Sequence, residues 1–534
     1  MAMLPALQSR FSDLYSVVYD LIDDAKKTRA LVKLYKGSHG ADNPHPVVPQ
    51  VGEYFFRERR GLLAFLCQES GAEHMSPRAL ERYDAARSPR IPSRDIYKLF
   101  AESSRHAGET DESFLRRVAS REHRLGWYRG GSSGFDDEAR ACLAAHFGST
   151  GISAHADEIL VCCGGAKGAF LSLCAAVMCR HERERVHRMS GRILAPAGYY
   201  QSLRVLPPVV GGTIDVVDTL SGRTVSAWLA DTARVPGTLV YVPLVNNFDG
   251  RVLIEDRARA IAEAVLQHNR RHPRTPVYVL GDDVYAGSYL TTTRARPIGS
   301  ITGTELGHPE LGNMADWTLS VATPSKTFAL PTSRVAFAHT TNPALRSAVN
   351  HYRTMLSYGR VPQGDELTAA AAICLTPQQW IDDWNRTYAR RVDWLSARLQ
   401  VLNHELGVQA FGLCRPEGGW YTALRIHPRL FPLQLPSSVH ALAVCLHYGG
   451  DQMDSGVGLL PGELAGYRLT RDTPEFVLRA SVAVTDSTLD TFVRRLADLA
   501  RRVTGPDGHR VIAEALNRAR SVVPDLDTIV TGAT

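Results

Sequence analysis

The feature that most constrains the fold of this chain is a series of short apolar runs between about residues 156 and 340. Their apolar residues are continuous rather than alternating, which is typical of strands buried on both faces of a largely parallel sheet. The series comprises residues 158–163, 192–196, 213–217, 238–244, 276–281, 317–322 and 334–339. It predicts an α/β fold with an open sheet whose ligands gather at the carboxyl ends of the strands.

Helix-like segments separate these runs. Residues 165–187 and 255–272 carry apolar residues at helical spacing and predict helices that cover the sheet. After about residue 345 the pattern changes to one long helix, two strand-like pieces and a closing helix, at residues 377–406, 418–426, 476–484 and 489–503. This order predicts a second, smaller α+β domain.

The composition argues against several other classes of protein. No apolar run approaches the length that spans a membrane, and the amphipathic N-terminal segment lacks the pattern of a secretory signal. The nine cysteines are odd in number and form no CxxC pair, which argues against disulfides and a zinc site and favours a reducing cytoplasm. No metal is expected. The net charge of +6 comes from scattered arginines, so nucleic-acid binding is not implied.

A lysine after the sixth apolar run is the strongest candidate for chemistry. Lys326 follows Thr323 and Ser325 and precedes Arg334 by eight residues. A lysine in a cleft can form a Schiff base with an aldehyde cofactor, and neighbouring hydroxyls and an arginine can hold a phosphate dianion. The alternative is a solvated loop lysine.

Two further segments support this candidate site. The glycine-rich turn 162–170 lies between a strand and a helix, where free N–H groups and the helix dipole can hold an anion, although a plain tight turn has the same pattern. Asp282 and Asp283 end a strand, with Tyr285 close behind. A carboxylate buried against a pyridine nitrogen would keep that ring protonated, whereas a surface pair would only cap the next element.

In this order the segments resemble the fold-type I enzymes of the aminotransferase class I/II family, which depend on pyridoxal 5′-phosphate (PLP). The resemblance runs from about Tyr128 to Ser481, with a weaker match at residues 34–44. It implies a large domain with a mostly parallel seven-stranded sheet, a smaller α+β domain and a homodimer with shared active sites. The chain is expected to be a divergent member.

The resemblance also implies roles for individual residues. Contacts to the cofactor phosphate are expected from Gly165, Ala166, Lys167, Thr323, Ser325, Arg334 and, across the dimer, Tyr128. The pyridine ring is expected to meet a stacking aromatic at Tyr199 or Tyr200, the partner of its nitrogen at Asp282, and 3′-oxygen donors at Asn247 and Tyr285. Lys326 would carry the Schiff base, and Lys326, Asp282 and Tyr199 are the expected catalytic residues. The substrate is expected to bind through Arg479, Gly37 and His39.

Several positions depart from the family pattern. Asn247-Phe248-Asp249-Gly250 stands where the family has Asn-Pro-Thr-Gly, and Gly198 and Thr332 replace a usual proline and glycine. The stretch before Tyr128 is also several tens of residues longer than usual. None of these departures removes a chemical group that the cofactor needs.

The expected organisation has four parts. Residues 1–50 would hold an N-terminal helix and a substrate-side segment of the small domain, and residues 51–127 an arginine-rich helical insertion. Residues 128–345 would form the PLP-binding large domain and residues 346–534 the C-terminal small domain. The insertion would be a cover over the active-site mouth or an addition to the dimer surface. The alternative is a solvated helical decoration.

The implied reaction begins when an amino acid places its carboxylate on Arg479 and forms an external aldimine in place of the bond to Lys326. The freed amine then removes the Cα proton. Transamination is the expected outcome. The alternative is elimination, replacement or ring closure on an activated amino acid such as S-adenosylmethionine in specialised biosynthesis, with oxidation by oxygen as a third outcome. A DNA-binding regulator is disfavoured because the basic segment 51–127 looks inserted rather than prepended.

Overall fold

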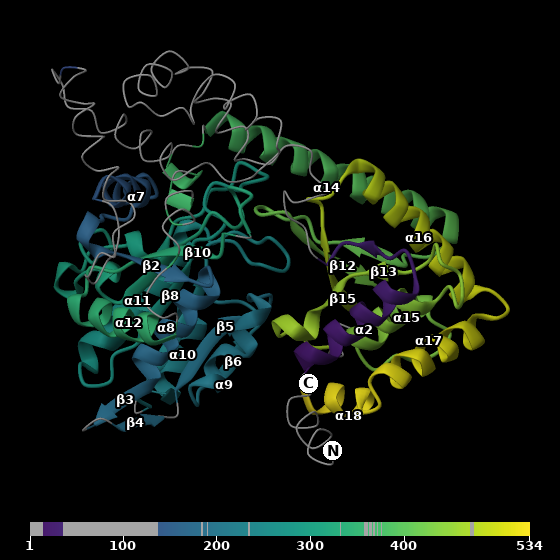
Figure 1. The fold of residues 1–534 in the computed structure, drawn as a ribbon, viewed down its shortest axis with the longest axis horizontal. Helices are drawn as coiled ribbons and strands as arrows, with labels where there is room; N and C mark the ends of the chain where they lie inside the picture. The colour runs from purple at the N-terminus through teal and green to yellow at the C-terminus, as the bar shows by residue number, and fades with distance from the viewer. Residues whose placement is uncertain are drawn as a thin grey trace, which may run out of the picture.

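The computed structural model describes residues 14–35, 110, 137–182, 185–188, 191–232, 235–331, 333–356, 361, 366, 369–370, 372–374, 376, 378–469 and 475–533. The expected site residues Tyr128, Gly37 and His39 lie outside the described residues, as do Thr332 and nearly all of the expected insertion. The described residues form two units that lie side by side (Figure 1).

The large unit is built on a seven-stranded sheet. Its strands are β2 (Ile159–Cys163), β5 (Arg192–Pro196), β6 (Thr213–Val217), β7 (Thr238–Pro243), β8 (Tyr278–Asp282), β9 (Thr318–Ala322) and β10 (Val335–His339). Their order is β2-β10-β9-β8-β7-β5-β6, and only β10 runs antiparallel to its neighbours. Each apolar run of the sequence forms one strand, which confirms the predicted α/β class.

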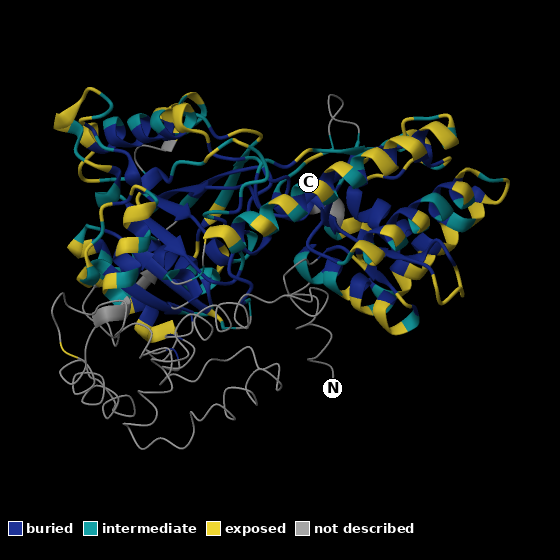
Figure 2. Cartoon of the chain, turned by 90° about the horizontal axis from the view of Figure 1, so that it is seen from above, coloured by how far each residue is buried: buried dark blue, intermediate teal, exposed yellow. Residues whose placement is uncertain are grey.

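Helices cover both faces of this sheet. On one face α8 (Ala166–Met178) and α12 (Pro343–Leu356) pack with strand residues such as Tyr241. On the other, α10 (Gly222–Thr232) and α11 (Glu255–Arg271) pack with Val240 and Val242, while α7 (Asp137–Ser149) packs with β2 and β10. Neighbouring residues of one strand are therefore buried against different layers, which explains the continuous apolar runs. Figure 2 shows the buried strands beneath partly exposed helices.

The helix expected at residues 165–187 is shorter than predicted. It ends at Met178 and is followed by an antiparallel hairpin of β3 (Cys179–Glu182) and β4 (Arg185–Arg188). A Cβ atom on Gly191 would lie 2.3 Å from Cγ of Met178, so the end of the helix packs tightly on the chain that enters β5. The next residues, CRHERERVHR, offer no apolar face that could continue the helix along the sheet.

The small unit contains a four-stranded antiparallel sheet in the order β11-β12-β15-β14 and a two-stranded parallel pair, β1 with β13. These strands are β11 (Phe411–Leu413), β12 (Tyr421–Ile426), β14 (Leu460–Pro461), β15 (Phe476–Ser481), β1 (Val32–Lys33) and β13 (Val457–Gly458). Its helices are α2 (Leu14–Thr28), α14 (Gln378–Leu406), α15 (Ser438–His447), α16 (Asp486–Thr504), α17 (Gly508–Val522) and α18 (Leu526–Ala533). Helix α2 packs against the C-terminal helices, so both ends of the described chain build this unit.

Short helical turns complete the described structure. They are η2 (Ala156–Glu158), η3 (Gln201–Arg204), α9 (Leu206–Val209), η4 (Ile298–Ser300), η5 (Pro309–Leu311), η6 (Met314–Asp316), η7 (Pro428–Leu430) and η8 (Gly462–Ala465). None of the described helices combines the length and the apolar character that crossing a membrane requires.

The expected domain boundary after residue 345 falls inside α12. Val349 and Tyr352 of this helix are buried in the core that α8 shares with the large sheet. Helix α14 then runs from one unit to the other (Figure 1): Ile381 packs in the large unit, and Leu395 and Leu399 pack in the small unit. We therefore propose that the boundary lies within α14.

Candidate active site

Lys326 lies in the loop between β9 and β10, and aromatic rings from both units surround its amine. Nζ lies 5.4 Å from the ring centroid of Tyr421 and 5.8 Å from those of Tyr285 and Trp420. Tyr285 follows β8 of the large unit, whereas Trp420 and Tyr421 begin β12 of the small unit. The amine therefore lies where the two units meet, within cation–π distance of three rings.

Trp420 and Tyr421 were not expected as site residues. Both are buried, and the guanidinium carbon of Arg479 lies 3.9 Å from the ring centroid of Tyr421. Their sequence signal is weak, because an aromatic pair at the start of a strand is ordinary core composition. Only the packing of the small unit against the large one brings these rings to Lys326.

Asp282 ends β8 and is almost fully buried. Its Oδ2 accepts a hydrogen bond of 2.5 Å from the hydroxyl of Tyr241, while Oδ1 has no partner among the described residues. Burial raises the pKa of Asp282 to about 6, and the hydrogen bond from Tyr241 and the positive charge of Lys326 oppose that rise. A buried carboxylate with one free oxygen is suited to bind a cationic N–H group.

Asp283 lies in a different environment from Asp282. Its backbone N–H donates to Val321, and its carboxylate lies near Ser320 rather than Tyr241. Burial and the adjacent Asp282 raise the pKa of Asp283 to about 7. Successive residues of an extended chain point to opposite faces, so the two carboxylates of the sequence pair separate and only Asp282 contacts Tyr241.

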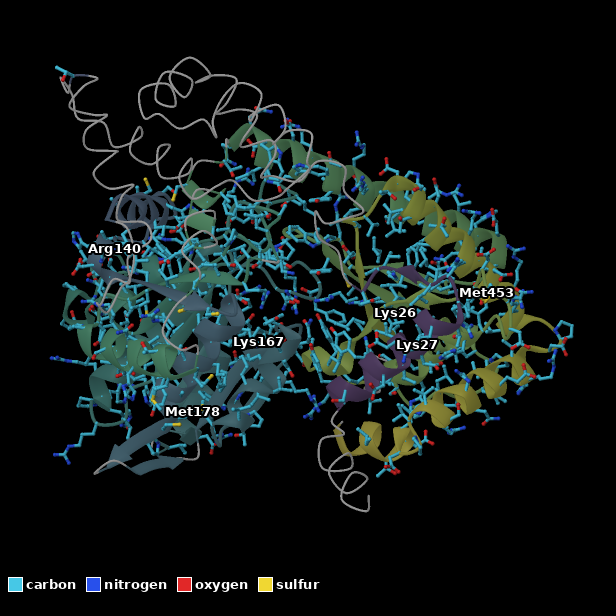
Figure 3. The ribbon with its side chains drawn as sticks, in the orientation of Figure 1. Lys26, Lys27, Arg140, Lys167, Met178 and Met453 are labelled. Carbon is cyan, nitrogen blue, oxygen red and sulfur yellow. The ribbon has the colours of Figure 1, made fainter. Side chains whose placement is uncertain are left out.

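The glycine-rich turn at the start of α8 lies against Arg334. The N–H of Gly165 donates to the carbonyl of Arg334 over 2.7 Å, and Nη2 of Arg334 donates to the carbonyl of Gly164 over 2.6 Å. The first N–H groups of the helix, at Ala166 and Lys167, have no acceptor within the helix. In Figure 3 Lys167 lies toward the small unit, and Met178 marks the other end of α8. Guanidinium and free N–H groups together form a candidate anion site.

Thr323 and Ser325 belong to the same neighbourhood. Their hydroxyls are 2.8 Å apart, and Oγ1 of Thr323 donates to the carbonyl of Val335, the residue after Arg334. Arg334 itself has a φ of +53°, a left-handed conformation that is uncommon outside glycine. The structure thus brings together the residues expected around a phosphate: Gly165, Ala166, Lys167, Thr323, Ser325 and Arg334.

Asn247 connects the two units at the other side of the site. Its Oδ1 accepts a 2.6 Å hydrogen bond from Nη1 of Arg479, and its amide nitrogen donates to the hydroxyl of Tyr285 over 3.4 Å. Burial raises the pKa of Tyr285 well above its usual value, so that hydroxyl keeps its proton and can donate in turn.

Arg479 in β15 is a buried cation whose bonds go to neutral groups. Besides Asn247, its guanidinium contacts Oε1 of Gln201 at 3.4 Å and the carbonyl of Tyr35 at 2.9 Å. Nε has no partner, and no carboxylate of the described residues forms an ion pair with Arg479. A buried guanidinium without a counter-charge is costly, so this group is suited to bind an external carboxylate.

Two contacts of Arg479 come from the N-terminal segment. Tyr35 lies in the weakly matching stretch 34–44. Tyr19 lies in α2, close enough to Arg479 that the positive charge lowers the pKa of Tyr19. Burial has the larger effect and raises that pKa. Tyr19 and Gln201 were not expected from the sequence, since neither belongs to a recognisable motif. The position of α2 in the small unit brings Tyr19 to the site, whereas Gln201 reaches Arg479 from η3 of the large unit.

The structure separates the adjacent tyrosines that were candidates for stacking on a ring. Tyr199 is 1% exposed, its phenol lies beside Arg204, and its ring packs where Gly466 leaves room. Tyr200 is half-buried, lies edge-on to Phe170 with centroids 6.4 Å apart, and acts electrostatically on the hydroxyls of Tyr241 and Tyr285. This placement argues against the expected catalytic role of Tyr199 and favours Tyr200.

The site therefore combines an anion-binding turn, a free amine, a buried carboxylate with one open oxygen and a buried arginine. An elongated ligand with a phosphate at one end and a protonated ring nitrogen at the other would satisfy the first three groups. The arginine would remain for the carboxylate of a second ligand.

Comparisons with known proteins agree with this arrangement. A family model described as aminotransferase class I and II matches residues 114–496. A search of curated proteins found no match. Among solved structures, the fold is similar to that of an aspartate aminotransferase from Thermus thermophilus with maleate, at 20% identity over 77% of this chain and 88% of the other, with a TM-score of 0.55.

Two further structures extend the comparison. The match to a double mutant of the Thermus thermophilus aspartate aminotransferase covers 91% of this chain and 96% of the mutant chain, at 17% identity and a TM-score of 0.58. An aromatic aminotransferase from Pyrococcus horikoshii OT3 matches at 20% identity over 77% of this chain and 93% of the other, with a TM-score of 0.56. At these identities the structural likeness shows the fold alone.

Proposed function

Because this chain belongs to the aminotransferase class I and II family, a family of PLP-dependent enzymes, we propose that it is an aminotransferase that removes the Cα proton of an amino acid. One observation carries the proposal. Asp282 and Arg479 each keep a buried polar atom that has no partner among the described residues, in the same site as the amine of Lys326.

PLP fits the residues that line this site. The phosphate would bind to the N–H groups at the start of α8, to Ser325 and to Arg334. The open Oδ1 of Asp282 would accept the N–H of the pyridinium ring, and Tyr200 would stack on the ring face. Asn247 and Tyr285 are proposed as donors to the ring oxygen.

Bound PLP supplies an electron sink for the charge left at the Cα atom of the substrate. The chain supplies the other functions. Arg479 binds the substrate carboxylate in a bidentate manner, which orients the Cα–H bond toward Lys326. The amine of Lys326 then accepts the Cα proton, and the carboxylate of Asp282 stays ionised because it faces a cation.

The position of Lys326 among the rings of Tyr285, Trp420 and Tyr421 restricts the access of water to its amine. Exclusion of water strengthens the charge interactions of the site and protects the reacting carbon from side reactions. The same amine could return the proton to the cofactor side. Water would then release the keto acid, and the amino group would pass to an acceptor keto acid in a second half-reaction that runs through the same steps in reverse.

The test is product identification by mass spectrometry with a panel of amino acids, with and without 2-oxoglutarate. An aminotransferase forms a keto acid from the amino acid and glutamate from 2-oxoglutarate, and each product depends on both substrates. Products that form without 2-oxoglutarate would instead indicate elimination, replacement, ring closure or oxidation. The Lys326→Ala variant should lose the visible absorbance of the cofactor-bound protein and form no product.

We also propose a homodimer in the cytoplasm. Support for the dimer comes from the family resemblance, in which Tyr128 would reach the phosphate of the neighbouring subunit. Support for a reducing compartment comes from the eight described cysteines, none of which forms a disulfide with another described residue. Analytical ultracentrifugation tests the first proposal, and imaging of a tagged chain tests the second.

A further inference from the structure

The turn formed by residues 246–250, which we call the Asn247 turn, departs most from its relatives at its two central residues. It follows β7 of the large unit and carries Asn247 into the site. Phe248 and Asp249 occupy the positions where the family has proline and threonine. Neither residue contacts Lys326, Asp282 or Arg479 through a hydrogen bond in the described structure, so the site itself gives no reason for their identity.

Phe248 is inserted into the small unit. It is 1% exposed and forms a small apolar cluster with Ala423 of β12 and Ala465 of η8. Its ring centroid lies 5.0 Å from that of Tyr467. A large-unit side chain thus completes a small-unit core, and the burial of its apolar surface stabilises the contact between the two units.

Asp249 adds a polar connection beside this apolar one. Its Oδ2 accepts hydrogen bonds from the hydroxyl of Tyr467 at 2.6 Å and from Nε of Arg251 at 2.7 Å. Oδ1 accepts from the backbone N–H of Arg251 at 3.1 Å, which closes the turn on itself. Burial and the neighbouring carboxylate raise the pKa of Tyr467, so its hydroxyl remains a donor.

Backbone contacts hold the end of the turn. The carbonyl of Gly250 accepts from the N–H groups of Glu417 and Gly418, both at 2.9 Å, and a carboxylate oxygen of Glu417 accepts from the N–H of Val252 at 3.0 Å. Gly250 has a φ of +72°, and a Cβ atom there would lie 2.3 Å from Pro416. Only glycine allows this close approach.

The start of the turn joins the loop that carries Tyr200. The amide nitrogen of Asn246 donates to the carbonyl of Ala197 at 2.8 Å, and the N–H of Gly198 donates to Ala465 at 2.8 Å. A Cβ atom on Gly198 would lie 2.2 Å from Oδ1 of Asn246. The glycine that replaces the family proline therefore makes room for the Asn246 side chain.

From these contacts we propose that Phe248 and Asp249 are positioning residues, which hold the Asn247 turn on the small unit through Tyr467 and so fix the Asn247 side chain against Arg479. The inference rests on the proposed function of Arg479 as the site for the substrate carboxylate. Asn247 is the acceptor of the shortest hydrogen bond of Arg479, so a shift of the turn would reorient the guanidinium. A shift of the turn should therefore weaken substrate affinity, measured as KM, more than it slows the chemical step, measured as kcat.

The experiment compares Tyr467→Phe and Asp249→Asn with the wild-type holoenzyme. Tyr467 and Asp249 line a cavity of about 670 Å³, so water can fill the space of a lost hydroxyl and Tyr467→Phe should fold. Tyr448→Phe is the matched control, because Tyr448 is a buried tyrosine of the small unit whose hydroxyl has no hydrogen-bond partner in the described part of the chain. The readouts are KM and kcat for the amino acid, the Kd for PLP, and hydrogen exchange of residues 246–252.

We expect Tyr467→Phe and Asp249→Asn each to raise KM about tenfold, the size of one lost hydrogen bond, with kcat unchanged. The Kd for PLP should rise by a smaller factor, because Asn247 is also a proposed donor to the ring oxygen. Amide exchange of residues 246–252 should become faster in both variants and stay unchanged in Tyr448→Phe. In the background of Asn247→Ala, Tyr467→Phe should raise KM no further, because the contact that it positions is already absent.

Two outcomes would overturn the inference. In the first, Tyr467→Phe and Asp249→Asn have the same KM as the control Tyr448→Phe. The other is a full additional effect of Tyr467→Phe in the Asn247→Ala background, which would show that Tyr467 does not act through Asn247. A wild-type protein that binds no PLP would instead refute the proposed function. Hydrogen exchange is measured on the protein alone, so it tests the positioning of the turn even if PLP does not bind.

Discussion

Oδ1 of Asn247 accepts a hydrogen bond from Nη1 of Arg479 over 2.6 Å, and this contact joins the large unit to the small one inside the candidate active site. The two residues are 232 positions apart in the sequence. Because Asn247 is neutral, the bond orients the guanidinium without neutralising it. The positive charge remains available to a carboxylate from outside.

The charge and fork geometry of Arg479 should therefore determine substrate affinity. We expect Arg479→Lys to lower kcat/KM by roughly 30- to 150-fold, or about 2–3 kcal/mol, because an ammonium cannot replace a bidentate contact. The Kd for PLP should not change. Arg425→Lys is the control, since Arg425 forms a half-exposed ion pair with Glu475 at 3.3 Å. Equal kinetics for Arg479→Lys and wild type would refute the role.

Asp282 should make the stability of the PLP-free protein depend on pH. Burial raises its pKa to about 6 from an ordinary value of 3.8, so the folded state holds the proton more tightly than the unfolded state does. Its contribution to stability is fully present below pH 3.8 and is lost as the pH rises through about 6. At pH 8 the ionised side chain costs about 3 kcal/mol.

We therefore expect PLP-free Asp282→Asn to gain unfolding free energy relative to the wild type at pH 8 and to lose that advantage at pH 4. Urea denaturation at the two pH values measures the difference. Binding of PLP should stabilise the wild type more than the variant at pH 8, because only the wild type supplies a carboxylate for the ring N–H. If the unfolding free energies of wild type and Asp282→Asn differed by the same amount at pH 4 and pH 8, the prediction would be contradicted.

Substitution at the adjacent tyrosines should separate ring stacking from core packing. We expect Tyr200→Ala to raise the Kd for PLP by about tenfold, because an aromatic stack contributes about 0.5–1.5 kcal/mol beyond its buried area. Tyr199→Phe should leave the Kd unchanged, since the Tyr199 ring packs near Gly466 and its hydroxyl lies beside Arg204. Fluorescence titration with PLP measures both values. A larger effect from Tyr199→Phe would reverse the assignment.

The glycine-rich turn at the start of α8, which is the proposed phosphate site, gives a further prediction. Gly165 has a φ of +66°, and a Cβ atom there would lie 3.5 Å from the guanidinium of Arg334. Gly165→Ala should strain the turn by about 1–2 kcal/mol and raise the Kd for PLP by roughly five- to thirtyfold. Gly148→Ala is the matched control, because Gly148 lies in α7 with nothing within 4 Å of the added atom. Equal affinities for the two variants would exclude phosphate binding at this turn.

Much of the fold was predictable because its signals are local. Continuous apolar runs predict strands covered on both faces, and the seven runs form the seven strands of the large sheet. The long helix α14 followed in the same way from its spacing. The end of α8 at Met178 did not follow, because packing against Gly191 decides it and no local pattern records that contact.

Within the site, the sequence by itself determined which chemical groups are present and on which elements they lie: Lys326 after β9, Asp282 at the end of β8 and Arg479 within β15. Only the tertiary structure decided which of them meet. The rings of Trp420 and Tyr421 around Lys326, the packing of Tyr199 near Gly466 and the connection of Phe248 to the small unit all depend on how the two units pack. Contacts between residues far apart in the chain leave no periodic pattern in the sequence. Burial, which raises the pKa of Asp282, exists only once those contacts form.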